Sequence, residues 1–331
     1  MGISRLLSST DTSAPQLQGT LGSLAAVLKA ALVDGYGTTD PLGWTLEYTA
    51  DTNYRMAFRN NPTTGTGFYF KINDNYSTNS RHAKFSAYEQ MTGIDTYVNP
   101  LLASEASPYT FHKSYYNTAQ GTAVPWFIIG DDRGFWLRTL GDYQRGSNYD
   151  YVNCGLTAYI GDYNPFLANS VYNFCFAWGG FSNYWCPGGT TTNDVAYTTF
   201  PYMGKASATP ANINVRLMRP LSGVAGAVTG KPCSDWATIT MSYCGDGGRA
   251  TSYDGIYPLG PRMMLAHNLD LLGTIPGGFG IDINGGTITA PAIYQQIIVD
   301  GDDRWMLCPG KTGTGVGAIA LKIGAGWRDD I

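Results

Sequence analysis

The stretch that decides the fold is Val124-Pro125-Trp126-Phe127-Ile128-Ile129-Gly130-Asp131-Asp132-Arg133-Gly134-Phe135-Trp136-Leu137-Arg138. An apolar segment, a polar segment and an aromatic segment follow one another, which is the pattern of two strands joined by a tight turn. Aspartates in such a turn usually accept hydrogen bonds from nearby backbone amides. We therefore expect a hairpin whose aspartates satisfy the turn and whose Arg133 pairs locally, rather than a carboxylate–arginine site.

A second stretch repeats this order near the end of the sequence. It runs Gln296-Ile297-Ile298-Val299-Asp300-Gly301-Asp302-Asp303-Arg304-Trp305-Met306-Leu307, with the same Asp-Asp-Arg triplet between an apolar and an aromatic segment. Two such matches indicate two similar β units and are consistent with a duplicated module.

Before the first hairpin, the sequence predicts an arm, a helix and a meander. Residues 1–19 mix Ser, Thr, Asp, Pro and Gln without periodicity, which indicates an extended arm that orders on a neighbouring subunit. Apolar residues at helical spacing then run from Leu21 to Leu32, with Ser23 as a capping residue and Gly35 as the stop. Short alternating strands follow, at residues 43–48, 54–59, 67–74 and 83–88.

These patterns together predict an α+β protein that is predominantly antiparallel β, in sandwich- or barrel-like units, with one N-terminal helix and an extended N-terminal arm. We divide it into the arm (1–19), a helix plus β-sheet region (20–120) and a β-rich region (121–331). The sequence leaves open whether the last two regions form one continuous domain.

The composition favours assembly over catalysis. Charged residues make up 14% of the 331 residues, against roughly 25% in ordinary soluble proteins. A chain with few charged and many aromatic residues suggests that part of its surface is buried against other subunits. The net charge of -4, without a Lys or Arg cluster, argues against nucleic-acid binding. No apolar run is long enough for a membrane span and Met1 to Ser13 lacks a secretory signal, so we expect synthesis in a cytoplasm.

Candidate chemistry is sparse. The sequence has three glutamates and three histidines, and it holds no recognisable catalytic motif, so we expect no catalytic residues, no cofactor and no metal site. A pair of aspartates acting as a glycosidase, and so a wall-degrading enzyme, stays as a remote alternative.

Six cysteines lie far apart in the sequence. Buried thiols are one interpretation. Late oxidation in a particle outside the cell is the other, and the two equally spaced pairs Cys175/Cys186 and Cys233/Cys244 are then the candidate disulfides.

The densest aromatic region surrounds a strand in which Tyr172, Phe174, Phe176 and Trp178 alternate onto one face, with Trp185 beyond it. Such a face suits a core or a contact between subunits. A platform that stacks on sugar rings, and so binds a host surface glycan, is the alternative.

Several segments resemble uncharacterised virion proteins of tailed bacteriophages. They are residues 9–15, 19–24, 31–37, 43–45, 67–70, 125–137 and 323–328. The resemblance implies a structural subunit of the virion in the neck, the tail or baseplate, or a capsid accessory layer, without catalytic residues. Its expected partners are further copies of itself and other virion structural proteins, without nucleic acid or membrane. A receptor- or glycan-binding module at the tail tip is the alternative.

Overall fold

The computed structural model describes residues 3–52, 54–74, 82–100, 110–113, 123–139, 156–167, 171–180, 214–219, 228–232, 259–267, 270–283, 297–300, 303–309 and 316–328. Over these residues the protein is built mostly of antiparallel strands, with one short helix near the N-terminus. The predicted fold class is confirmed. In the same part of the chain, no helix is both long and apolar enough to cross a membrane.

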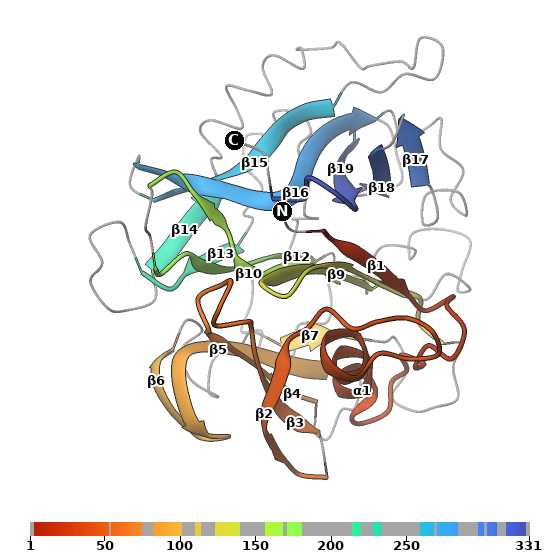
Figure 1. Ribbon diagram of the computed structural model, residues 1–331, viewed down its shortest axis with the longest axis vertical. Helices are drawn as coiled ribbons and strands as arrows, with labels where there is room; N and C mark the ends of the chain where they lie inside the picture. Colours follow the sequence, from red (N-terminus) through yellow and green to blue (C-terminus); the bar gives the residue numbers. More distant parts are fainter. Residues whose placement is uncertain are drawn as a thin grey trace, which may run out of the picture.

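A small sheet forms one layer at the bottom of Figure 1. Its strand order is β2-β3-β4-β5-β6, with β7 also paired to β5, so consecutive strands are neighbours as the predicted meander requires. Its strands are β2 (Thr45–Ala50), β3 (Arg55–Arg59), β4 (Tyr69–Asn73), β5 (His82–Gly93), β6 (Thr96–Pro100) and β7 (Thr110–His112).

A large sheet forms the other two layers, because its second half lies over its first half (Figure 1). The central layer contains β1 (Arg5–Ser8), β8 (Trp126–Gly130), β9 (Gly134–Thr139), β10 (Leu156–Asp162), β12 (Phe174–Gly180) and β13 (Asn214–Leu217), in that order. The path continues through β14 (Val228–Pro232), β15 (Leu259–His267), β16 (Asp270–Ile283), β19 (Val316–Ile323), β18 (Asp303–Pro309) and β17 (Ile297–Asp300), and β11 (Asn164–Pro165) pairs with β16.

The central layer is buried on both faces. Successive side chains of a strand point to opposite faces. Phe135 and Leu137 on β9 therefore enter the core shared with the helix and the small sheet, whereas Trp136 between them enters the core shared with β16, β18 and β19. This double burial explains why residues 126–129 and 135–137 are continuously apolar instead of alternating with polar residues.

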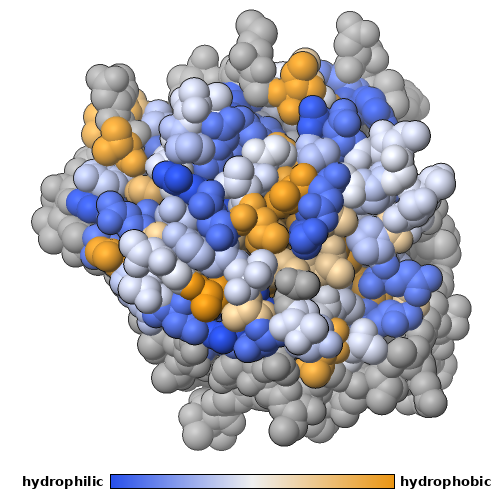
Figure 2. Space-filling model, turned by 60° about the horizontal axis from the view of Figure 1, so that its bottom comes forward, coloured by the Kyte–Doolittle hydropathy of each residue, from blue (hydrophilic) through white to orange (hydrophobic). Residues whose placement is uncertain are grey.

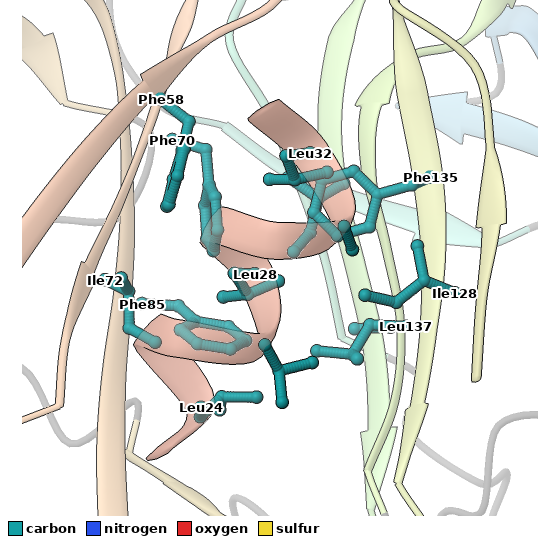
Figure 3. Close-up of a cluster of buried hydrophobic side chains, with 14 of the residues drawn as sticks. Leu24, Leu28, Leu32, Phe58, Phe70, Ile72, Phe85, Ile128, Phe135 and Leu137 are labelled. Atoms are coloured by element: carbon teal, nitrogen blue, oxygen red, sulfur yellow. The ribbon is translucent and has the colours of Figure 1, made fainter. Parts of the chain in front are cut away.

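The helix lies between the small sheet and the central layer. Helix α1 (Ser23–Lys29) continues through a π turn (Ala30–Asp34) and ends at Gly35, whose φ of 73° suits a glycine, so the predicted stop is confirmed. Figure 3 shows Leu28 and Leu32 between the aromatic rings of the small sheet and the side chains of β8 and β9. The predicted cap is wrong, because the N-cap is Gly22 and the Ser23 hydroxyl donates to the Gln18 carbonyl at 2.6 Å.

The N-terminal segment is extended, but it packs on its own chain. Strand β1 pairs antiparallel with β8, and Leu7 and Leu17 have no exposed surface. The Trp126 indole also donates to the Pro15 carbonyl at 3.0 Å. Leu7 and Leu17 thus complete the core of their own chain, and the contact of the arm with a neighbouring subunit stays a prediction for its exposed residues.

Both Asp-Asp-Arg triplets lie at hairpins, as predicted, but at different turn positions. In the first hairpin the Asp131 amide donates to the Gly134 carbonyl at 2.9 Å, which leaves Asp132 and Arg133 as the connecting residues. In the second hairpin Asp303 pairs with Asp300, and Asp303 and Arg304 already belong to strand β18. The repeated triplet is therefore not a repeat of one turn structure.

Candidate functional site

The turn between β8 and β9 holds a buried ion pair. Asp131 Oδ1 accepts hydrogen bonds from the backbone amides of Arg133 and Gly134, at 2.9 and 3.0 Å, as the turn hypothesis expects. Arg328 donates to both carboxylate oxygens of Asp131, and both side chains are at most 6% exposed. Burial and full hydrogen bonding together make this a strong and direction-specific contact.

Asp162, at the end of β10, extends this contact to the small sheet. Its carboxylate accepts hydrogen bonds from Asn60 Nδ2 at 2.9 Å and from the Thr66 amide and hydroxyl at 2.8 and 2.7 Å. Its carbonyl accepts from Arg328 Nη1 at 2.8 Å. Burial raises the pKa of Asp162, although the Thr66 hydrogen bonds and the Arg328 charge oppose that rise.

We call Asn60, Thr66, Asp131, Asp162 and Arg328 the layer clasp. It joins the loop between β3 and β4, the turn between β8 and β9, the end of β10 and the segment after β19. Arg133 takes part only loosely, with its Nε 3.5 Å from Asp162 Oδ2. The expected local partner of Arg133 is therefore wrong, since the carboxylate that faces it comes from a neighbouring strand.

Two glycines give the clasp its close backbone approach. A Cβ on Gly134 would lie 2.3 Å from the Tyr159 hydroxyl oxygen, and one on Gly161 would lie 2.3 Å from the Gly134 Cα. Gly161 also has a φ of +136°, which other residues rarely adopt. Any side chain at these two positions would push the clasp strands apart.

A second buried pair lies at the start of the helix. Asp74 and Lys113 are in contact, and neither side chain has exposed surface. Asp74 Oδ2 also accepts the helix amides of Leu24 and Ala25, at 2.9 and 3.1 Å, so Asp74 supplies the cap that Ser23 does not. Burial raises the pKa of Asp74 to about 6 against the opposing charge of Lys113, and burial lowers the pKa of Lys113.

A third ion pair joins the small sheet to the end of β13. Arg219 donates to both oxygens of Glu89, at 2.5 and 2.8 Å, and Asn99 donates to Glu89 at 2.8 Å. Burial alone would raise the pKa of Glu89, but these hydrogen bonds bring it below its ordinary value. The Arg219 guanidinium also lies 3.7 Å from the centre of the Tyr172 ring, in a cation–π contact.

The aromatic strand lies in the interior. Phe174 and Phe176 have no exposed surface and belong to the helix-side core, against which Tyr172 packs partly buried. The prediction that these three share a face is confirmed, but Phe174 and Phe176 are core residues and not interface aromatics. Trp178 lies on β12, but its side chain is outside the described part of the structure. Trp185 lies outside the described residues entirely.

Cys175 lies on the opposite face of the same strand. It is a free thiol with no exposed surface, in the core shared with β16, β18 and β19, and burial raises its pKa. Cys186, Cys233 and Cys244 lie outside the described residues, so the redox state of these three remains a prediction.

The three ion pairs have two features in common. Each of the three ion pairs joins segments that are distant in the sequence, and each charge is met by a partner of the same chain. Among the residues that the structure describes, no three His, Cys, Asp or Glu residues gather as a metal site would require.

Fold and sites define the protein as a layered, mostly antiparallel β protein that buried ion pairs tie together. No protein-family model matches its sequence, and no curated protein matches it either.

Proposed function

We propose that this protein is a structural, non-enzymatic subunit of a tailed-bacteriophage virion, in the neck, the tail or baseplate, or a capsid accessory layer. The observation that carries the proposal is that the buried charged groups pair with one another. The layer clasp and the other two ion pairs join segments of the chain that are distant in the sequence. The weakly charged composition and the resemblance to virion proteins support the same role.

Assembly contacts of the N-terminal arm would involve its exposed residues, since Leu7 and Leu17 are buried in its own chain. Strands β2 and β6 are the two edges of the small sheet, and both alternate between exposed and half-buried side chains. An exposed edge offers unpaired backbone groups to a second strand. Figure 2 shows a surface with scattered apolar residues among polar ones on the side of this sheet.

The glycan-binding alternative loses the support of two of its aromatic residues, while the Trp178 side chain and Trp185 lie outside the described residues. Aromatic rings that stack on sugars must reach solvent, and Phe174 and Phe176 do not. The two aspartates of the layer clasp, Asp131 and Asp162, accept hydrogen bonds from Arg328 and Thr66.

Purified particles test the proposal directly. We expect quantitative mass spectrometry of particles from a producing culture to find the protein at a fixed copy number, and labelled antibodies to mark one position on the particle. In a strain from which the gene has been deleted, expression of the unchanged sequence should restore particles, and expression of the variant Lys29→Met, which changes a partly exposed residue, should restore them equally. Absence of the protein from washed particles would refute the proposal.

A further inference from the structure

Lys113 and Asp74 meet the geometric requirements for a covalent bond between their side chains. The amine and the carboxyl group are in direct contact, and both side chains are fully buried. They reach this site from positions 39 residues apart, Asp74 directly after β4 and Lys113 directly after β7. The core around the helix start keeps them together and keeps water out.

The carboxyl group is held as the electrophile of an acyl transfer is held. Two backbone amides, those of Leu24 and Ala25, donate to Asp74 Oδ2 at 2.9 and 3.1 Å. Paired amides at this position stabilise the negative charge that develops on oxygen when a nucleophile attacks the carbon. On the other side, the Thr20 carbonyl accepts from Lys113 Nζ at 2.5 Å and fixes the amine.

Burial also favours the reactive protonation states. It raises the pKa of Asp74 and lowers that of Lys113, so a shift of one proton from the ammonium to the carboxylate gives a neutral amine beside a neutral acid. A neutral amine is a nucleophile, and a protonated carboxyl oxygen can leave as water.

We propose that Lys113 and Asp74 form an intramolecular isopeptide bond. The nitrogen lone pair attacks Asp74 Cγ, and Oδ2 carries the negative charge against the two helix amides. Oδ1 already carries the proton that came from the ammonium; one further proton passes from the nitrogen to Oδ1, the Cγ–Oδ1 bond breaks, and one water leaves. Ammonium and carboxylate thus become an amide and water, without any oxidant, reductant or further reactant.

A second buried lysine serves as an internal control. The side chain of Lys71 is 1% exposed and its Nζ lies 2.9 Å from Asp95, but the Asp95 side chain is 53% exposed. Hydrogen bonds from Lys71 and Arg55 lower the pKa of Asp95, so its carboxylate stays charged and hydrated. We expect no bond between Lys71 and Asp95.

Mass spectrometry of the full chain tests the proposal. After reduction and allowance for loss of Met1, the intact protein should be lighter than its sequence by one water. Trypsin should then give peptide 72–81 joined to a peptide that runs from 85 to 133 without cleavage at Lys113, while cleavage after Lys71 proceeds normally. Lys113→Arg, which keeps the positive charge, should have the full sequence mass, and Asp74→Asn can form the same bond with loss of ammonia.

The proposal is independent of the role in a particle. An unchanged mass of the folded, unmodified sequence would overturn it. So would a loss of water that persists in Lys113→Arg, or one that maps to an Asp-Gly sequence such as Asp34-Gly35, where aspartate can cyclise on the backbone.

Discussion

Arg328 meets Asp131 across 197 residues of sequence, in a place that is nearly closed to water. Removing two charges from water costs free energy, and the pair recovers that cost only because every acceptor of Asp131 is used. The carboxylate receives two turn amides and two guanidinium hydrogen bonds. Loss of one partner would leave the other buried and uncompensated.

Arg328→Met should therefore lower the free energy of unfolding by about 3–5 kcal/mol. Urea unfolding, followed by circular dichroism, measures this loss. Lys29→Met is the matched control, because the Lys29–Asp34 pair is exposed and should contribute less than about 1 kcal/mol. Equal losses in the two variants would show that the clasp does not stabilise the fold.

Lys113→Met should make stability depend on pH through Asp74. Burial raises the folded-state pKa of Asp74 to about 6 even with Lys113 present, above the unfolded value of 3.8. Since the folded state then binds the proton more tightly, the variant should gain stability as pH falls from 7 towards 4, by roughly 3 kcal/mol.

The double variant Asp74→Asn with Lys113→Met isolates this effect, because it keeps the Lys113 change and removes the titrating group. Between pH 7 and pH 4, the free energy of unfolding of the double variant should change by roughly 3 kcal/mol less than that of Lys113→Met. Parallel pH profiles for the two variants would contradict the assignment.

At the scale of elements, periodic patterns predicted the secondary structure well. The apolar spacing from Leu21 to Leu32 and the stop at Gly35 define the helix, and the short alternating segments define the small sheet. These features depend on neighbours in the sequence, so the sequence displays them directly.

The ion pairs and the helix cap were not predictable in the same way. Asp74 caps the helix by accepting a hydrogen bond from the Leu24 amide, 50 residues earlier in the sequence, and Arg328 pairs with Asp131 in a turn 197 residues earlier. Such contacts depend on how the layers meet, and no local pattern marks them. The double burial of β12 had a sequence signal in its unbroken apolar run, but this run does not distinguish a core from a subunit contact.

The N-terminal strand gives a prediction about an element. Leu7→Ala should cost about 2–5 kcal/mol of unfolding free energy, because Leu7 is fully buried in the helix-side core. Ile3→Ala, two residues outside β1 and 65% exposed, should change stability by less than about 0.5 kcal/mol. A small effect of Leu7→Ala, shown by denaturant unfolding, would mean that β1 does not complete this core.

At the scale of the whole molecule, the central layer belongs to two cores. Its strands β8, β9, β10 and β12 contribute to the helix-side core through one face and to the core under β16, β18 and β19 through the other. The helix and the small sheet therefore cannot be separated from these four strands without exposing apolar surface.

Hydrogen exchange should follow this arrangement. We expect the amides of Trp136 on β9 and Tyr159 on β10 to exchange most slowly, since they open only when both cores open. Amides of the edge strands β2 and β6 should exchange fastest among the small-sheet strands. If the small sheet stayed protected while β9 and β10 exchanged, the layers would be independent units.

The contact between Ser4 and Gly324, near opposite ends of the described chain, has a consequence for folding during synthesis. The Ser4 amide donates to the Gly324 carbonyl at 3.0 Å and the Gly324 amide donates to the Ser4 hydroxyl at 2.9 Å. A ribosome makes the first partner long before the second, and contacts between distant residues form slowly. Folding is thus completed only after residue 328 has been translated, although β1 and β8 can pair as soon as residue 130 has been made.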